Sequence, residues 1–275
     1  MARTEQDKQA QAQLQVESHR IRYRLRSTFF YRKLKEYNTL AFPSMIASLF
    51  SVENLYDWQD RASWGISEDA FSYIVRRQGF KLIQVFCHPK LLREYPMLVA
   101  YYRNIAALSQ KSVKYLVGID VTVYEANGSI KRQMTDTHAF LLARLFNEHV
   151  SLIIDSSIQS LTEQELGGLL LISTGAQIDG AWRNAIGEEA EKVIQRLLVK
   201  EAVERSLLFG LMPRNGTKVE LYKTDQYEEL LGSIGRYRGI HLNNQTSLIF
   251  SSEPDISLIG KHGNTLGIIE VKGGD

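Results

Sequence analysis

Hydrophobic and polar positions follow a mainly helical pattern over the N-terminal half of the chain. Residues 4–38 are rich in Gln, Arg, Lys and Glu and contain neither Gly nor Pro, which favours helix over strand. Residues 42–106 continue this pattern, although the run 80–86 could form a strand. Apolar positions at helical spacing predict another helix over residues 137–159, so this part of the chain is expected to be mainly α-helical.

Two further helices are predicted in the middle of the chain. The first follows Thr162, because Thr162 and Glu165 have the spacing of a capping box. The second follows Asn184, and its apolar residues form one buried stripe: Ile186, Ala190, Val193, Ile194, Leu197 and Leu198. A cluster of Ser, Thr and Gly at residues 173–180 separates the two patterns. We therefore predict a helical region over residues 1–175 and a second domain over residues 176–275.

The C-terminal part of the chain has the pattern of a sheet. Strands are predicted over residues 218–222 and 246–251, with a short helix over residues 225–231. Two apolar runs then flank the tetrapeptide Lys-His-Gly-Asn at positions 261–264, a turn-forming sequence. The end of the chain is therefore predicted to fold as a β-hairpin.

Composition narrows the class of protein only slightly. The 275 residues are 44% hydrophobic, enough for a substantial core, and the net charge of +2 leaves any basic surface to be local. The single cysteine, Cys87, rules out an internal disulfide framework and is expected to be a small buried apolar residue. No apolar run reaches the length of a membrane span, and the N-terminus is not signal-like. A cytoplasmic protein without a membrane partner is expected.

The candidate catalytic residues lie on the predicted hairpin. Side chains alternate along a strand, so Glu270 and Lys272 share a face, and hairpin pairing brings Asp255 near them. Two carboxylates, with the backbone carbonyl of Val271, are hard oxygen ligands of the kind that Mg²⁺ prefers. Lys272 could orient or help to deprotonate an attacking water and offset charge in a phosphorane-like transition state. The alternative is an ordinary hairpin whose charged residues are only solvated.

The sequence Pro254-Asp255, followed at the far end of the predicted hairpin by Glu270-Val271-Lys272, resembles the signature of the PD-(D/E)xK nuclease superfamily. This resemblance implies an α/β fold in which the helical N-terminal region precedes a restriction-endonuclease-like core with a mixed sheet. It also implies Mg²⁺-dependent phosphodiester hydrolysis by Asp255, Glu270 and Lys272. Such nucleases often carry another acidic residue on the helix before the core strands. Glu191, one helical turn after Gly187, resembles that residue, although it could equally be a helix surface charge.

Basic residues are the candidates for DNA contact. The densest cationic block, residues 20–35, includes Arg22, Arg24 and Arg26, which could bind phosphates with a strong dependence on salt or form the solvated face of a packing helix. Arg183 and Asn184, predicted just before the second helix, suit base edges, phosphates or a helix cap equally well.

Several short motifs together resemble the XcyI family of type II restriction endonucleases. They are Trp64-Gly65-Ile66, Cys87-His88-Pro89, Tyr101-Tyr102-Arg103, Ser109-Gln110-Lys111, Trp182-Arg183-Asn184, Ser252-Glu253-Pro254-Asp255 and Glu270-Val271-Lys272-Gly273-Gly274. The resemblance implies a prokaryotic enzyme of restriction-modification defence that cuts double-stranded DNA at CCCGGG. Cleavage would leave 5′ overhangs with a 5′-phosphate, and a palindromic site implies a homodimer.

One feature departs from the superfamily pattern. Its core continues past the Glu-x-Lys strand, whereas this sequence stops at Asp275, so a C-terminally truncated, incomplete core is expected. Two alternatives to restriction stay open: another PD-(D/E)xK nuclease acting in repair or on DNA junctions, and a DNA-binding module of the same fold without catalysis.

Overall fold

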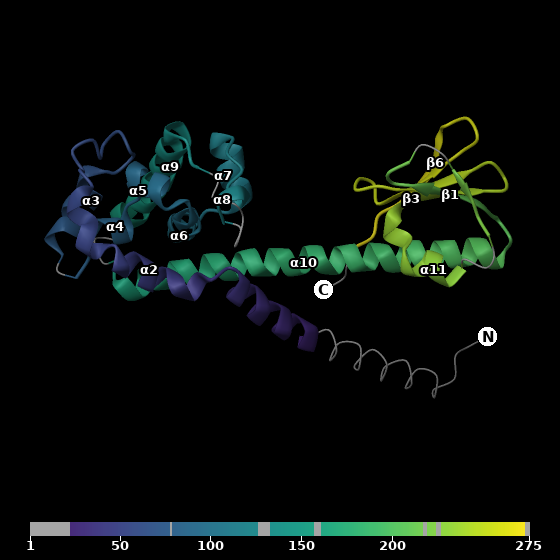
Figure 1. The fold of residues 1–275 in the computed structure, drawn as a ribbon, viewed down its shortest axis with the longest axis horizontal. Helices are drawn as coiled ribbons and strands as arrows, with labels where there is room; N and C mark the ends of the chain where they lie inside the picture. The colour runs from purple at the N-terminus through teal and green to yellow at the C-terminus, as the bar shows by residue number, and fades with distance from the viewer. Residues whose placement is uncertain are drawn as a thin grey trace. The chain divides into compact units, whose positions relative to one another are not determined.

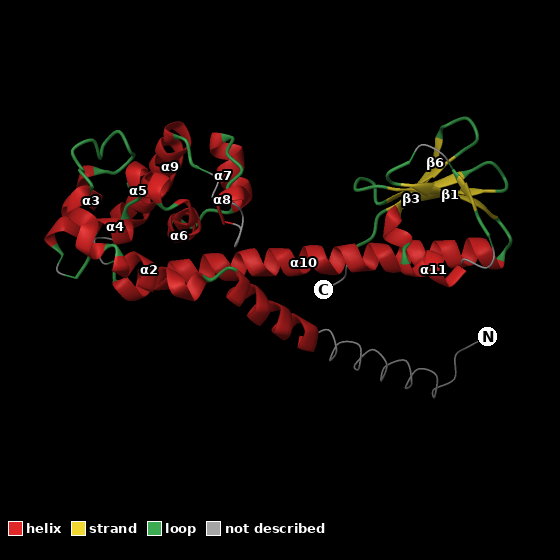
Figure 2. Cartoon of the chain, viewed as in Figure 1, coloured by secondary structure: helices red, strands yellow, loops and turns green. Residues whose placement is uncertain are grey.

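A computed structural model describes residues 23–77, 79–125, 133–156, 161–216, 219–223 and 227–272. The chain divides into two compact units, residues 1–180 and 181–275. Figures 1 and 2 show a first unit built from helices and a second that contains the sheet. Each unit is described separately.

Helices and turns make up the described part of the first unit. Residues 23–36 are helical, in agreement with the sequence pattern. The elements that follow are η1 (Thr39–Ala41), α2 (Phe42–Ser48), η2 (Phe50–Leu55), α3 (Glu68–Arg76), α4 (Leu82–Val85), α5 (Pro89–Glu94), η3 (Pro96–Leu98), α6 (Val99–Ile105), α7 (Gln110–Val117), α8 (Thr122–Glu125), α9 (Asp136–Ser156) and the start of α10 (Glu163–Glu204).

Helix α9 is central to the core of this unit. Its residues Leu142, Phe146, Val150 and Ile154 recur at helical spacing, and each is at most 3% exposed. Helices α3, α5, α6 and α7 pack against α9. The predicted helix over residues 137–159 is therefore confirmed over Asp136–Ser156 and supplies one continuous apolar face.

The run 80–86 is not a strand. It contains helix α4, and its residues Ile83, Val85 and Phe86 are fully buried. So short a helix leaves backbone carbonyls without helical partners. The Tyr102 hydroxyl donates to the Ile83 carbonyl and the Tyr101 hydroxyl to the Gln84 carbonyl, both at 2.6 Å. These distant side chains stabilise a conformation that the local pattern did not favour.

Helix α10 begins where the sequence predicted. The Thr162 N–H donates to Glu165 Oε2 (2.7 Å), and the Glu165 N–H donates to the Thr162 hydroxyl (3.1 Å), which completes the capping box. The prediction of a separate helix after Asn184 is wrong, because α10 continues without a break through residues 173–180 to Glu204. Glycine lowers helix stability by only about 1 kcal/mol, and neither Gly175 nor Gly180 has the positive φ of a helix end.

The second unit contains a six-stranded sheet. Its strands are β1 (Leu208–Pro213), β2 (Glu220–Leu221), β3 (Tyr237–Leu242), β4 (Ser247–Phe250), β5 (Ile256–Ile259) and β6 (Thr265–Ile269), in the order β2-β1-β3-β4-β5-β6. Helix α11 (Tyr227–Gly232) and η5 (Ile234–Arg236) lie between β2 and β3. Strands β2 and β4 and helix α11 confirm the elements predicted at residues 218–222, 246–251 and 225–231.

One face of the sheet is covered by helices. Val199 and Ala202 of α10 and Leu230 of α11 are buried with Ile240, Phe250 and other sheet residues in one core cluster, and Figure 1 shows α10 and α11 on the same side of the sheet. All five strand pairings are antiparallel, whereas a mixed sheet was predicted. A parallel pair needs a crossover connection of about a dozen residues or more, and β3 to β6 are joined by shorter turns. The α/β fold is restriction-endonuclease-like in its helix-covered sheet.

Candidate active site

The predicted hairpin is present at the end of the described chain. Strands β5 and β6 pair with Ile256 opposite Ile269 and Ser257 opposite Ile268. The Gly260 N–H donates to the Asn264 carbonyl (2.8 Å), and Gly263 has a φ of 79°, a value that glycine adopts readily. The residues that indicated a turn in the sequence therefore form the turn of the hairpin.

Asp255 stands directly before β5 and is held by a tight turn. The Ser251 N–H donates to the Asp255 carbonyl (3.1 Å), and the Ser251 hydroxyl donates to the Pro254 carbonyl (2.5 Å). Continuing the strand register by one position sets Asp255 opposite Glu270. The half-buried Asp255 side chain accepts a hydrogen bond from the Val271 N–H at 2.6 Å. Asp255 is thus tied directly to the Glu-x-Lys segment.

Glu270 and Lys272 flank this hydrogen bond. Strand β6 ends at Ile269, so the segment follows the strand instead of lying within it. Both side chains are exposed. Within the described ranges neither forms an ion pair, which leaves a carboxylate and an ammonium beside Asp255 available to a ligand.

Glu191 lies on α10, within the electrostatic reach of Asp255. Burial raises the pKa of the Glu191 carboxyl above its ordinary value, and the negative charge of Asp255 raises it further. Glu188 acts in the same direction, while Lys192 and Arg214 oppose the shift. Carboxylates that repel one another in this way are a feature of sites that bind cations.

These residues supply only some of the ligands that Mg²⁺ needs. Among the residues that the structure describes, no group of three or more His, Cys, Asp or Glu side chains is arranged to hold a metal ion. One oxygen of Asp255 is engaged by the Val271 N–H, which leaves the other for a cation. The donors are hard oxygens, as Mg²⁺ requires, and Mg²⁺ commonly keeps several waters and takes further oxygens from a phosphate.

The candidate DNA contacts fall at different places. Arg22 lies outside the described residues. Arg24 is exposed on the N-terminal helix, and Arg26 pairs with Asp179 at 2.8 Å. Arg183 and Asn184 are exposed in the middle of α10 and do not precede a helix, so Asn184 is not an N-cap. The prediction placed them before a second helix, but the two predicted helices are parts of one.

Sequence reasoning missed a buried polar network in the first unit. Arg103, only 2% exposed, makes a bidentate ion pair with Glu125, with N–O distances of 2.6 and 3.0 Å. Gln110 donates to Glu125 (2.6 Å), and Gln177 accepts from Arg103 (2.9 Å). The available signal was an arginine inside an apolar run at residues 98–108, which is rare without a buried partner.

The prediction that Cys87 is buried is confirmed, since its side chain is fully buried. The neighbouring His88 has a structural role: its Nδ1 accepts from the Lys90 N–H (3.1 Å) at the start of α5. Tyr101 and Tyr102 form an aromatic pair with ring centroids 5.1 Å apart.

Comparison with known proteins defines the class of the chain. A family profile for a restriction endonuclease matches residues 73–275, most of the sequence. The profile is described as XcyI restriction endonuclease, and the chain belongs to that family. No curated protein and no solved structure matches it. Membership supports a type II restriction enzyme, and therefore a nuclease that binds DNA. Among the helices that the structure describes, none combines the length and the hydrophobicity that a membrane span requires.

Proposed function

We propose that the chain is a site-specific deoxyribonuclease that hydrolyses double-stranded DNA with Mg²⁺ at the hairpin of the second unit. The observation that carries the proposal is the 2.6 Å hydrogen bond from the Val271 N–H to Asp255. It links two short motifs that are separate in the sequence, and it holds two carboxylates and a lysine at the same end of one hairpin. The chain belongs to a family of restriction endonucleases, which supports a nuclease role for these residues.

Each residue has a distinct role in the proposal. Asp255 and Glu270 would hold Mg²⁺ with the Val271 carbonyl, and Glu191 would add a carboxylate from α10. The bound cation would polarise the scissile phosphate and promote ionisation of water. Lys272 orients the attacking water and offsets negative charge as it accumulates on the phosphate oxygens. The water oxygen bonds to phosphorus as the bond to the 3′ oxygen breaks, leaving a 5′-phosphate and a 3′-hydroxyl.

The proposed target is the palindrome CCCGGG, cut to leave 5′ overhangs in restriction-modification defence. Support for this site comes from the short motifs shared with the XcyI family. A palindrome is read most simply by two copies of the chain related by a two-fold axis. Arg24 and Arg26 of the N-terminal helix and Arg183 and Asn184 of α10 are the proposed contacts to DNA, together with Arg22.

Cleavage of duplex DNA in Mg²⁺ and in EDTA tests the proposal. Discrete fragments whose ends lie within CCCGGG, formed only in Mg²⁺, are expected. Lys272→Ala should slow cleavage by about 10²- to 10³-fold, the usual effect of removing one transition-state donor. Lys261→Ala, which removes an exposed lysine at the turn of the same hairpin, is the matched control and should cut normally.

Three other outcomes would contradict this function. Cleavage that depends on DNA junctions instead of sequence would point to a repair nuclease. Binding without cleavage in any divalent metal would point to a non-catalytic module. Equal rates of cleavage by Lys272→Ala and Lys261→Ala would show that Lys272 is not part of the active site.

A further inference from the structure

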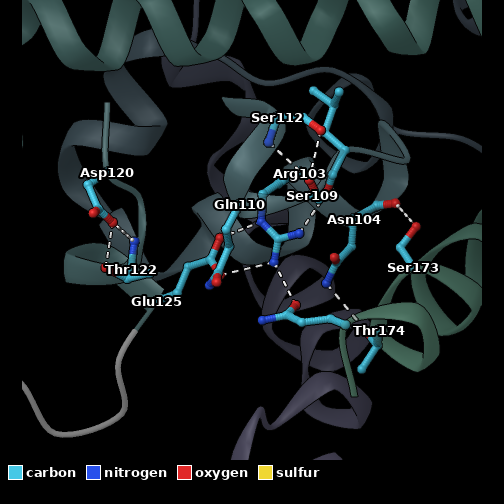
Figure 3. Close-up of polar contacts among 12 residues, drawn as sticks. Arg103, Asn104, Ser109, Gln110, Ser112, Asp120, Thr122, Glu125, Ser173 and Thr174 are labelled. Carbon is cyan, nitrogen blue, oxygen red and sulfur yellow. Dashed lines mark hydrogen bonds and ion pairs between the residues drawn. The ribbon is translucent and has the colours of Figure 1, made fainter. Parts of the chain in front are cut away.

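A cavity of about 380 Å³ opens in the helical unit, apart from any residue of the proposed active site. Its wall includes side chains from the N-terminal helix, α2, α6, α7, α8 and α10. The volume lies within the range of about 300–1,000 Å³ usual for small-molecule sites. The buried network around Arg103 contributes Arg103, Gln110, Glu125 and Gln177 to its wall. Figure 3 shows the polar contacts that join Arg103, Gln110 and Glu125.

Asn104, a residue of this wall, carries an unpaired acceptor. The Thr174 hydroxyl donates to the Leu170 carbonyl (2.8 Å), so towards Asn104 it can only accept. Asn104 therefore turns its Nδ2 to Thr174 (3.3 Å; Figure 3). Its Oδ1 is left buried without a hydrogen-bond partner among the described residues, although Asn104 is only 3% exposed. An unpaired buried acceptor costs about 1–3 kcal/mol. The atom has almost no accessible surface, so the Asn104 side chain has to turn slightly towards the cavity before a ligand can donate to it, and recovering this cost favours the turn.

Two glutamines present complementary groups beside this acceptor. Gln110 uses its Nε2 on Glu125, which leaves its Oε1 as an acceptor. Gln177 uses its Oε1 on Arg103, which leaves its Nε2 as a donor. Both amides are held by charged partners, so their orientation is fixed before any ligand arrives. The Arg103–Glu125 pair thus positions the amides.

The charge and shape of the cavity define the ligand. Arg103 is balanced by Glu125, and Lys33 is balanced by Glu36 at 2.8 Å, so the paired charges cancel. Phe42 and Tyr37 add aromatic rings to the wall. Amide groups read the edges of nucleobases, and aromatic rings pack on their faces.

We infer that this cavity binds a neutral nucleobase, with Asn104 Oδ1 accepting one of its N–H groups and the amides of Gln110 and Gln177 meeting its other polar atoms. The base can come from a free nucleoside or from DNA, as a nucleotide rotated out of a duplex bound by the same chain. The same base, with the same polar atoms, would enter the cavity from either source.

Calorimetric titration of the full chain in EDTA tests the inference. Adenosine, guanosine, cytidine and thymidine are the probes, and ribose is the control that lacks a base. At least one nucleoside should bind with a Kd below about 1 mM. Asn104→Leu should weaken that binding by about tenfold or more, since it removes a hydrogen bond to a buried group. Gln177→Leu, at a half-buried position, should weaken it too and serves if Asn104→Leu does not fold.

A duplex carrying 2-aminopurine at each position of CCCGGG in turn distinguishes the two sources. A rise in its fluorescence on binding, lost in Asn104→Leu, would identify an extruded base, whereas nucleoside binding alone would identify a free ligand. Gln84→Leu removes a half-buried amide outside the cavity and should bind as the unmodified chain does. Asp255→Asn should leave the binding of free nucleosides in EDTA unchanged, which separates this inference from the proposed nuclease activity. The inference is overturned if neither probe reports binding, or if Asn104→Leu and Gln177→Leu both bind normally.

Discussion

At the scale of single residues, the buried Arg103 shows how charge can be accommodated inside a helical unit. Its guanidinium donates to both oxygens of Glu125, to the Leu108 carbonyl and to Gln177. A buried ion pair often adds little net stability, because desolvation offsets the attraction between the charges. Loss of only one partner is different, since it leaves an uncompensated charge in the interior.

Glu125→Leu should therefore destabilise the chain by about 3–5 kcal/mol, the usual cost of breaking a buried pair. Urea unfolding measures this loss. Arg144→Ala breaks an exposed pair with Glu148 one turn away on α9 and should cost only about 0.3–0.5 kcal/mol. Similar losses for the two variants would show that Glu125 and Arg103 are not a buried pair.

Glu191 should give stability an unusual dependence on pH. Its pKa is raised in the folded chain above the ordinary 4.5, so the folded state holds the proton more tightly than the unfolded state. Its contribution to stability consequently improves as pH falls through the raised pKa and is unfavourable at neutral pH. Glu191→Gln should raise the free energy of unfolding at pH 7, by less than about 1 kcal/mol, and change it little at pH 4.

The matched control is Glu189→Gln, on the same helix close to Glu191. Glu189 pairs with Arg196 at 3.4 Å, so its loss should not stabilise the chain. Thermal unfolding at both pH values makes the comparison. A Glu191→Gln variant that is less stable at pH 7 than the unmodified chain would contradict a pKa of Glu191 raised by burial and by the charge of Asp255.

At the scale of elements, helix α10, from Glu163 to Glu204, differs most from its predicted form. Its glycines were interpreted as a break, but a helix ends when its backbone leaves helical geometry, commonly with a residue at positive φ. Gly118 does this after α7, with a φ of 72°, whereas Gly175 lies inside α10. Gly118 therefore ends a helix, whereas Gly175 is an interior residue of one.

Alanine substitutions separate the two cases. A Cβ built at Gly175 or at Gly118 meets no atom within 4 Å, so only backbone preference differs between them. Gly175→Ala should stabilise the chain by up to about 1 kcal/mol, because alanine favours helix. Gly118→Ala should destabilise it by about 1–2 kcal/mol, because its backbone is left-handed. Destabilisation by Gly175→Ala, measured by thermal unfolding, would place the predicted break back at residues 173–180.

The elements that could be predicted from the sequence are those whose cause is local. The hairpin turn at 261–264, the capping box of Thr162 and Glu165 and the apolar face of α9 each depend on neighbouring residues. Helix α4 depends on the hydroxyls of Tyr101 and Tyr102, and the network of Arg103 needs a partner as distant in the sequence as Gln177. A pattern along the chain does not contain such pairings.

The candidate site shows the same division between local and distant causes. Asp255, Glu270 and Lys272 were found from the alternation of side chains along the predicted hairpin and from a resemblance, and the hairpin itself was found through its turn. The bond between the Val271 N–H and Asp255, and the effect of Asp255 on Glu191, required the folded chain. No motif in the sequence joined the residues of the nucleobase cavity into one site, because several separate elements contribute to its wall.

At the scale of the whole molecule, the two units carry different chemistry. Asp255, Glu270, Lys272 and Glu191 all belong to residues 181–275, while the nucleobase cavity is built within residues 1–180. The family profile covers parts of both units. Damage to the hairpin should therefore abolish hydrolysis of DNA without affecting the cavity.

The most direct test of the central claim is the rate of DNA cleavage in Mg²⁺ by Asp255→Asn. Asparagine can still accept the hydrogen bond from the Val271 N–H, so the hairpin is retained while one negative charge is lost. Cleavage should fall by at least about 100-fold, and Glu253→Gln, at an exposed carboxylate shortly before Asp255, should cleave normally. Cleavage by a folded Asp255→Asn at the rate of the unmodified chain would contradict the assignment of this hairpin as the active site.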